Sequence, residues 1–375
     1  MKILRIIARL NIGGPARNAV LLSESAGWET VLVCGEAGGT EGDMMFLAQQ
    51  KGIRPIIIKE LAREISWKDD WTAFWKIYKI IRREKPDIIH THTAKAGTLG
   101  RLAGILYGKA ILIHTFHGHV FSGYFGKIKT LFFIWVERFL ALFTDKIITV
   151  SENLKDELAE KFRIAPENKI SVIELGFELE DLLKLPEREN QQTINIGIVG
   201  RLVPIKNHKM LFKSVCRGGF QTRPYRIIVI GDGEMRGELE KYAEELGIRD
   251  RIEFKGWIKD LKAIYEELDI VALTSLNEGT PVSLIEAMAG ARPVVATNVG
   301  GVKDIVKDGV SGYLVESGNV EEFTRRLLEL IKDSEKRKAF GLNGRDIVKN
   351  RFSKERLIKD TERLYNSTLQ KNKNI

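Results

Sequence analysis

Short apolar segments alternate with longer amphipathic ones along nearly the whole chain. Apolar, β-branched runs of roughly four to eight residues are typical of buried strands, and the segments between them have the spacing of helices. In the first half, strands are expected at residues 2–8, 30–34, 55–58, 87–90, 111–114, 146–150 and 170–174. In the second half, they are expected at residues 194–199, 226–230, 252–254, 269–273, 293–297 and 313–315. Strands that alternate with helices in this way predict an α/β protein with doubly wound parallel sheets.

A polar segment separates the two series of strands. Residues 181–192 contain Pro186 and are mostly polar or charged, which is typical of an interdomain linker. The chain of 375 residues is long enough for two domains of ordinary size. We therefore expect an N-terminal domain over residues 1–185 and a C-terminal domain over residues 190–353.

The segment after the expected strand 269–273 combines a glycine turn with two acidic residues. Glu278 lies in the turn, Thr280 is expected to cap the next helix, and Pro281 is expected to be its first residue. Such a helix, at the carboxyl end of a parallel strand, offers free N–H groups to an anion. Glu286 lies two turns into the helix. Carboxylates beside a phosphate site need hydroxyl partners, which ribose and sugars provide. The alternative is that Glu278 and Glu286 are ordinary solvent-exposed charges.

This segment resembles the donor signature of the retaining glycosyltransferase family 4 (glycosyl transferases group 1). Seven residues separate Glu278 from Glu286, the tripeptide 279–281 reads GTP, and a second glycine turn follows at Gly300-Gly301. The resemblance implies the GT-B fold, in which two Rossmann-like domains face a central cleft. It also implies that a last helix, at about residues 354–375, crosses back to the first domain. Asp304, expected at a helix start, departs from the Glu that relatives often carry there.

The resemblance assigns roles to residues of the C-terminal half. Glu286 is expected to hold the ribose hydroxyls, and Glu278 the hydroxyls of the donor sugar. Backbone N–H groups at Gly279 and Thr280 are expected to hold the diphosphate together with Arg201 and Lys206. These two cations, in the segment GRLVPIKN, would stabilise the leaving diphosphate without a metal ion. The alternative is that both are ordinary surface charges.

Further donor contacts are expected from other strand ends. They are Gly14, Gly231, Gly233, Trp257 and Ile258. In the family, the chain around Trp257 meets the base largely through backbone groups, so the sequence does not distinguish uridine from guanosine or adenosine; a UDP-sugar is the favoured donor. The indole either stacks on the base or only packs.

A glycine turn follows the first expected strand. Gly13 and Gly14 allow a ligand to approach the backbone closely, and Arg17 lies on the next helical turn. The full GxGxxG pattern is missing, so the turn does not indicate dinucleotide binding. The resemblance places it beside the acceptor and the donor phosphates, with Gly13 and Arg17 on the acceptor side; a tight turn without a ligand is the alternative.

Five of the six histidines lie close together in the sequence: His90, His92, His114, His117 and His119. A metal site is disfavoured because no HExxH motif and no nearby thiol is present. The segment ILIHTFHGHVF resembles the catalytic histidine segment of the family, with His117 as the functional residue and His119 as second choice, on the acceptor side. A neutral imidazole there would hydrogen-bond a sugar hydroxyl or stabilise the anomeric carbon. The alternative is a loop histidine that bonds only to backbone.

Two aromatic stripes lie in the first half. Residues 118–144 combine many aromatic side chains with Lys127, Lys129 and Arg138, and another stripe is formed by Trp67, Trp71 and Trp75. Core packing is the expected use of both. For the longer stripe, the alternative is a helix that lies on an anionic membrane surface. Since the family binds its acceptor in this half, a lipid-linked acceptor is a reasonable hypothesis.

Composition limits the remaining choices. Hydrophobic content of 44% and charged content of 29% are typical of a globular protein, and no apolar run reaches the roughly 20 residues that span a bilayer. Two distant cysteines, Cys34 and Cys216, fit a reducing, cytoplasmic location. A net charge of +9 favours an anionic partner. The basic residues are scattered and form no nucleic-acid motif, so nucleotide-sugar phosphates and a membrane surface remain.

The residues and the family resemblance together predict a metal-independent, cofactor-free hexosyltransferase of cell-surface polysaccharide or glycolipid biosynthesis. It would move a sugar from a nucleoside diphosphate donor, UDP favoured, to a glycan or lipid-linked acceptor; the resemblance implies retention and front-face attack. Two rivals remain: a nucleotide-sugar 2-epimerase or hydrolase on the same fold, and a nucleotide-sugar-binding protein without turnover.

Overall fold

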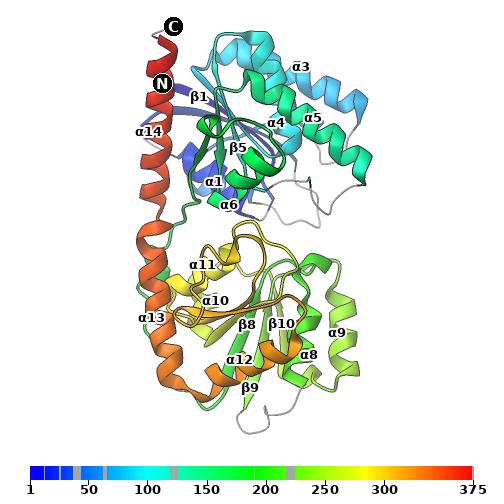
Figure 1. Cartoon of the computed structure of the whole chain (residues 1–375), viewed down its shortest axis with the longest axis vertical. Coiled ribbons are helices and arrows are strands. Elements are labelled where there is room, and N and C mark those ends of the chain that lie inside the picture. Colours follow the sequence, from blue (N-terminus) through cyan, green and yellow to red (C-terminus); the bar gives the residue numbers. More distant parts are fainter. Residues whose placement is uncertain are drawn as a thin grey trace. The chain divides into compact units, whose positions relative to one another are not determined.

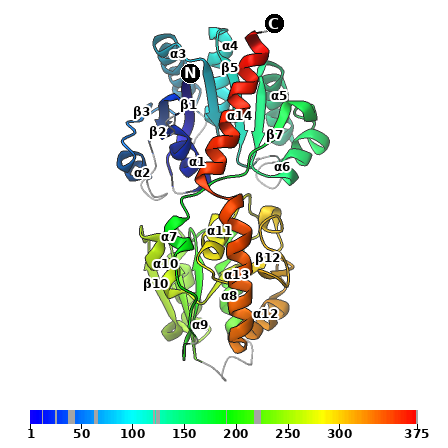
Figure 2. The ribbon, with the colours of Figure 1, turned by 90° about the vertical axis from the view of Figure 1, so that its left-hand side faces the viewer.

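A computed structural model describes residues 1–11, 13–24, 27–36, 44–61, 66–118, 121, 126–189, 191–216 and 224–373. The chain divides into two compact units (Figures 1 and 2). The first comprises Met1–Phe177 and Lys354–Ile375, and the second comprises Glu178–Ser353. The second unit therefore begins before residue 185, where the sequence placed the end of the first domain.

The expected linker belongs in part to the second unit. Its first residues lie in the short helix α7 (Glu180–Leu183), and the side chains of Leu182 and Leu185 are buried. The Arg345 guanidinium donates a hydrogen bond to the Leu185 carbonyl at 2.6 Å. Apolar contacts at these two leucines explain why the segment packs despite its polar composition.

The first unit contains a seven-stranded parallel sheet in the order β3-β2-β1-β4-β5-β6-β7. The strands are β1 (Lys2–Arg9), β2 (Glu29–Gly35), β3 (Ile56–Ile57), β4 (Ile88–His92), β5 (Ile111–Phe116), β6 (Lys146–Thr149) and β7 (Ile170–Val172). The helices are α1 (Gly14–Ser23), α2 (Met45–Gln50), α3 (Trp67–Glu84), α4 (Ala94–Tyr107), α5 (Lys127–Phe143), α6 (Glu152–Asp156) and α14 (Lys354–Lys373).

Helices cover both faces of this sheet. Leu4, Ile6 and Ile89 of the strands pack with α3 and α4 on one face. Ile3, Ile88 and Ile113 pack on the other face with Leu22 of α1 and with Leu357 and Tyr365 of α14. Figure 2 shows α14, in red, beside α1 on that face. Since neighbouring side chains of a strand point to opposite faces, the continuous apolar runs of the sequence are explained by burial on both sides.

The second unit contains a six-stranded parallel sheet in the order β10-β9-β8-β11-β12-β13. The strands are β8 (Ile194–Val199), β9 (Tyr225–Ile230), β10 (Ile252–Gly256), β11 (Ile270–Leu273), β12 (Val294–Thr297) and β13 (Gly312–Val315). The longer helices are α8 (His208–Cys216), α9 (Arg236–Glu245), α10 (Leu261–Glu267), α11 (Val282–Ala289), α12 (Val320–Lys332) and α13 (Ser334–Arg351).

Each expected strand has a counterpart in these sheets, and the predicted α/β fold is confirmed. Two local predictions are wrong. Pro281, and not Thr280, is the N-cap of α11, because Pro281 has extended backbone angles and its carbonyl accepts the first helical hydrogen bonds. Asp304 does not start a helix; it lies in a turn after the short 3-10 helix Gly300–Val302.

Candidate active site

The order of the strands in the second unit reverses direction at β8, which is the kind of point where open α/β sheets bind ligands. The chain leaves β8 toward β9 on one side and later returns to β11 on the other side of β8. The loops that follow β8 and β11 therefore diverge from neighbouring strands, and ligands of open α/β sheets bind at such points, outside the carboxyl ends of the strands. Lys206 lies in the loop after β8, and Glu278 lies in the loop after β11.

Lys206 and Glu278 form an ion pair at this position. The Lys206 Nζ lies 2.6 Å from Glu278 Oε1, and the two side chains are 24% and 10% exposed. The Ser275 hydroxyl donates to the same carboxylate oxygen at 2.5 Å. Backbone contacts hold the loops together, because the Leu276 N–H donates to the Ile205 carbonyl at 2.8 Å. A cation and a carboxylate are thus presented side by side and remain partly accessible to a ligand.

Glycines let neighbouring loops pack backbone against backbone. Gly300 has a φ of +50°, and a Cβ there would lie 1.9 Å from the Glu278 carbonyl oxygen. A Cβ at Gly301 would lie 2.0 Å from the Gly279 oxygen, and the Gly301 N–H donates to the Glu278 carbonyl at 3.1 Å. A Cβ at Gly231 would likewise meet the Gly200 carbonyl at 1.9 Å. The glycine turns therefore determine where the loops that carry the charged residues lie.

The start of α11 lies directly after the Glu278 loop. No side chain caps this eight-residue helix, so N–H groups of its first turn have no side-chain acceptor. Arg201, two residues after β8, is partly buried, and its side chain has no hydrogen-bond or ion-pair partner within the described part of the chain. Thr280 is partly buried and Gly279 is exposed. Backbone N–H groups, Arg201 and Lys206 are donors of the kind that bind a diphosphate.

Glu286 lies on α11 and is only 3% exposed, so the alternative that it is a solvent-exposed charge is wrong. The Tyr265 hydroxyl of α10 donates to Glu286 Oε2 at 2.8 Å. Trp257 is 39% exposed just after β10, and Ile258 is partly buried. The Gly231 N–H donates to the Gly256 carbonyl at 2.8 Å, which places the glycine turn after β9 beside the residue that precedes Trp257.

The first unit has a corresponding position between β1 and β4. Gly13 and Gly14 follow β1 and begin α1 without a side-chain cap. Gly14 is buried, and Arg17 is partly buried on the first turn of α1. The Arg17 N–H donates to the Gly13 carbonyl at 3.2 Å, so the turn leads directly into the helix.

The histidines of the first unit form a buried cluster with Arg5. His90 and His92 of β4 and His114 of β5 are at most 1% exposed, and Arg5 of β1 is fully buried. His92 Nδ1 lies 3.0 Å from Nε2 of His117, which follows β5. Among the described residues, no group of three or more His, Cys, Asp or Glu side chains is arranged to hold a metal ion. The other functional candidate, His119, lies outside the described residues.

Burial keeps these imidazoles neutral. It lowers the pKa of His90 and of His92 well below 6.5, and the nearby Arg5 charge lowers both further. Burial alone lowers the pKa of His117 to about 3. Sequence reasoning did not identify Arg5 or Tyr365 as neighbours of this cluster; the presence of a charged residue inside the apolar strand β1 was the available indication.

Comparisons with known proteins agree with these observations. The model described as "Glycosyltransferase Family 4" matches residues 17–181, and that described as "Glycosyl transferases group 1" matches residues 182–347. The uncharacterized glycosyltransferase MJ1178 of Methanocaldococcus jannaschii is 31% identical over 298 residues, which cover 78% of each chain. The chain belongs to this glycosyltransferase family.

Two other relatives extend the comparison. The UDP-Gal:alpha-D-GlcNAc-diphosphoundecaprenol alpha-1,3-galactosyltransferase of Escherichia coli is 29% identical over 315 residues, which cover 80% of each chain. The crystal structure of Anabaena Alr3699/HepE in complex with UDP superposes with a TM-score of 0.81 at 21% identity. It covers 98% of this chain and 100% of that one. The glycosyltransferase described here therefore has the GT-B fold that its sequence predicted.

Most described aromatic side chains of the two stripes are exposed, so the prediction that both pack in the core is wrong for most of their length; Phe121 is buried as predicted. On α5, the exposed apolar side chains are Ile128, Leu131, Phe132, Trp135, Phe139, Leu142 and Phe143. On α3, Trp67, Trp71 and Trp75 are 90%, 64% and 38% exposed. Each helix buries a different stripe, such as Ala73, Ile77 and Ile81 of α3. None of the described helices combines the length and the hydropathy needed to cross a membrane.

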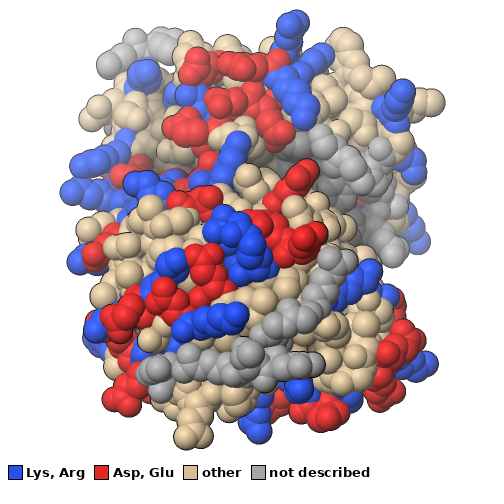
Figure 3. Space-filling model, turned by 60° about the horizontal axis from the view of Figure 1, so that its bottom comes forward, with Lys and Arg blue, Asp and Glu red and all other residues tan. Residues whose placement is uncertain are grey.

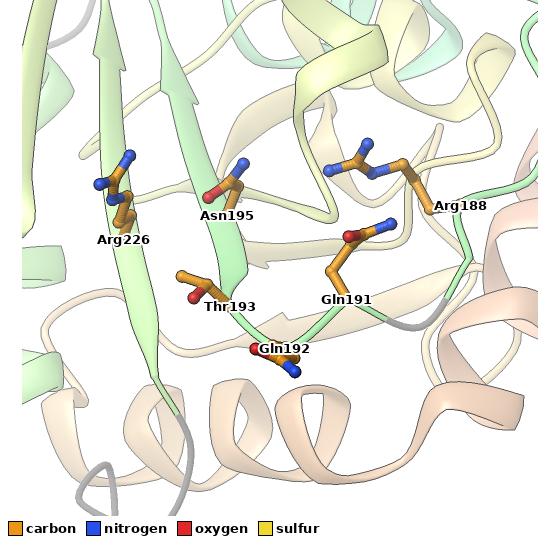
Figure 4. A pocket seen from close by; sticks show the side chains of 6 residues that line it. All are labelled: Arg188, Gln191, Gln192, Thr193, Asn195 and Arg226. Carbon is orange, nitrogen blue, oxygen red and sulfur yellow. The ribbon is translucent and has the colours of Figure 1, made fainter.

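A polar depression lies at the other end of the second sheet. It is lined by Arg188, Gln191, Gln192, Thr193, Asn195 and Arg226, at the amino ends of β8 and β9 (Figure 4). Arg188 is already engaged by Asp269 at 3.0 Å and by the Glu267 carbonyl at 3.1 Å. This depression therefore lies away from the loops that carry Lys206 and Glu278, and its arginine has a structural role.

Proposed function

We propose that this glycosyltransferase moves a sugar from a nucleoside diphosphate sugar to a glycan or lipid-linked acceptor, with retention of the anomeric configuration. The observation that carries the proposal is the Lys206–Glu278 pair beside the uncapped start of α11. A diphosphate sugar needs cationic and N–H donors for its phosphates and acceptors for its hydroxyls. These two residues, with Arg201 and the α11 N-terminus, provide both.

In this proposal, the Lys206 ammonium leaves Glu278 when the donor binds. Lys206 and Arg201 then donate to the diphosphate and stabilise the charge that develops as its bond to the sugar breaks, which makes a metal ion and any other cofactor unnecessary. Glu278 accepts hydrogen bonds from the sugar hydroxyls, and Glu286, oriented by Tyr265, accepts from the ribose. His117 donates to a hydroxyl of the donor sugar. The acceptor hydroxyl oxygen bonds to the anomeric carbon on the face from which the diphosphate leaves, and the departing phosphate oxygen takes the hydroxyl proton.

A UDP-sugar is the favoured donor, since the Escherichia coli relative is named for UDP-Gal and the Anabaena structure holds UDP. The name of the same relative contains a diphosphoundecaprenol, which supports a lipid-linked acceptor and a role in cell-surface polysaccharide assembly. A nucleic-acid partner is disfavoured. On the face drawn in Figure 3, basic and acidic side chains of the described residues are interspersed instead of forming a basic track.

Paired lysine variants test the donor site. Lys206→Met should lower kcat/KM with a UDP-sugar by about 100- to 1000-fold, the loss typical of one electrostatic donor at a transition state. Lys209→Met removes a lysine of the same segment whose partner, Glu238, lies on α9, and it should stay near wild type. UDP should also raise the melting temperature of the wild-type protein more than that of Lys206→Met. Equal turnover by both variants would refute the assignment.

Two controls separate the rival functions. Incubation with the UDP-sugar alone should leave it intact, whereas rapid epimerisation or hydrolysis would favour the first rival. Binding of UDP without transfer to any lipid-linked or glycan acceptor would favour the non-catalytic one. UDP, GDP and ADP sugars compared in the same melting experiment should show the largest shift for UDP.

We infer that the protein associates peripherally with the inner face of the plasma membrane through α5. Lys127 and Lys129 are exposed at the start of this helix. Its single acidic residue, Glu137, is buried and paired with Arg101 at 2.6 Å. The exposed side of α5 therefore presents apolar side chains and cations without an acidic charge, the combination that binds an anionic bilayer.

Vesicle binding tests this inference. Phe132→Glu and Trp135→Glu should each weaken co-sedimentation with vesicles that contain phosphatidylglycerol, while Val310→Glu, at an exposed apolar position of the second unit, should not. Wild-type binding should fall at high salt because the lysine contribution is screened. Absence of binding together with a concentration-dependent dimer that Trp135→Glu abolishes would assign the face to a second copy of the chain instead.

A further inference from the structure

Arg5 is buried in the first unit among groups that are not acidic. Within the described part of the chain, no carboxylate forms an ion pair with it. Its Nη1 lies 2.8 Å from His90 Nδ1 and 3.2 Å from His92 Nε2. Its Nη2 donates to the Leu22 carbonyl at 3.4 Å and to the Tyr365 hydroxyl at 3.3 Å. Burying a charge without an ionic partner costs free energy, which hydrogen bonds to neighbouring polar groups offset only in part.

The hydrogen bonds of Arg5 determine the positions of the histidine protons. A guanidinium carries only donors, so His92 Nε2 must act as the acceptor. A neutral imidazole that accepts at one nitrogen carries its proton at the other, so His92 has its proton on Nδ1. That proton is donated to His117 Nε2 at 3.0 Å. His117 therefore accepts at Nε2 and carries its own proton on Nδ1.

The ring geometry supports this series of hydrogen bonds. The planes of His92 and His117 differ by 27°, and their centroids are 5.3 Å apart although the two bonded nitrogens are only 3.0 Å apart. The rings therefore meet end to end, as an N–H···N bond requires, and not face to face. His90 completes the arrangement because its Nε2 lies 2.7 Å from the Thr115 hydroxyl, while its Nδ1 faces two donors, the Tyr365 hydroxyl at 2.5 Å and Arg5 Nη1 at 2.8 Å.

We propose that Arg5 and His92 are positioning residues that hold His117 in a single tautomer and make its Nδ1–H available to an acceptor oxygen of the substrate. His117 Nδ1 is inaccessible to solvent and has no hydrogen-bond partner among the described residues. An N–H donor in this state matches a sugar hydroxyl or a phosphate oxygen. The identity of that oxygen rests on the proposed function, whereas the tautomer does not.

The proton positions can be measured directly. In protein labelled with ¹⁵N-histidine, long-range proton–nitrogen correlation spectra distinguish an imidazole protonated at Nδ1 from one protonated at Nε2. Wild-type His117 should show the Nδ1–H form alone. Protonation at Nε2, or a mixture of both forms, would overturn the proposal without any variant being made.

Two variants of matched size test the role of His92. The amide nitrogen of His92→Asn can still donate to His117 Nε2, whereas His92→Leu has no donor. The leucine variant should lose the single tautomer and about 100-fold in kcat, with little change in KM for the donor, while the asparagine variant should keep the Nδ1–H form and most of kcat. Equal losses in both, with the Nδ1–H form retained, would indicate a merely structural role.

The tautomer measurement and the transfer assay separate this proposal from the proposed function. Nδ1–H at His117 together with no transfer of sugar by the wild-type protein would refute the proposed function but not the tautomer assignment. Transfer by the wild-type protein with Nε2–H at His117 would refute the tautomer assignment but not the proposed function. Melting temperatures of both variants, measured alongside, show whether either has lost its fold.

Discussion

Lowering the pH from 7.5 to 5.5 should destabilise the first unit much more than the second. His90, His92 and His114 are buried in the first unit, and burial lowers the pKa of each well below 6.5. Burial also lowers the pKa of His117, in the same unit, to about 3. Below pH 6.5 the unfolded chain binds protons at these positions and the folded chain does not. The free energy of unfolding therefore falls as the pH falls, and it is fully restored above this range.

The size of the effect follows from linkage. For one histidine whose pKa falls from 6.5 to far lower values on folding, the loss between pH 7.5 and 5.5 is about 1.4 kcal/mol. The four histidines of the first unit whose pKa is lowered together give about 5.5 kcal/mol, a large part of the roughly 5–15 kcal/mol by which a domain is stable. The second unit contains one histidine, His208, whose pKa is lowered to about 4 by burial and then by Lys206. It should lose only about 1.4 kcal/mol.

Urea unfolding at the two pH values measures these losses. Five of the six tryptophans, at positions 28, 67, 71, 75 and 135, belong to the first unit, so tryptophan fluorescence reports mainly on it. His114→Gln removes one titrating group, and its loss between pH 7.5 and 5.5 should be smaller than that of the wild type by about 1.4 kcal/mol. Carboxylates contribute little because they titrate at lower pH. Equal losses in variant and wild type would refute the reasoning.

Two further changes test packing that supports the sites. Gly301→Ala should lower UDP-sugar affinity at least 10-fold, because its Cβ would press on the Gly279 carbonyl, whereas Gly237→Ala, with open space around it, should leave binding measured by calorimetry unchanged. Arg101→Met should lower the urea-derived stability of the first unit by about 3–5 kcal/mol because it leaves the buried Glu137 unpaired, and adding Glu137→Leu should restore most of the loss. A double variant as unstable as the single one would contradict this.

The elements that depend on local patterns were predictable from the sequence. Apolar runs gave all the strands in order, and the spacing of Glu278, Glu286 and Gly301 marked the loops that meet at the end of β11. Lys206 was predictable as well, since it follows a strand of the same sheet. The structure adds that its ammonium bonds to Glu278 at 2.6 Å, a contact over 72 residues that no local pattern indicates.

Whether an aromatic stripe faces the core or the solvent was not predictable from its spacing. Trp67, Trp71 and Trp75 repeat every fourth residue, but so do Ala73, Ile77 and Ile81 on the same helix, and a helix buries only one stripe against a single sheet. The presence of two apolar stripes on α3 was the indication that one of them remains exposed. The environment of Arg5 was even less predictable, because the side chains that bond to it lie on β4 and on α14, 85 to 360 residues away.

The two units hold their cations in different settings. Lys206, in the loop after β8, is 24% exposed and bonds to a carboxylate that is also partly accessible, so a phosphate and a sugar hydroxyl can replace the two partners at little cost. Arg5, within β1, is fully buried, and its partners are neutral imidazoles, a hydroxyl and a carbonyl. A ligand cannot take its place without exposing the core. Lys206 is therefore suited to exchange partners during turnover. Arg5 is suited to keep the protons of His92 and His117 in the same positions during turnover.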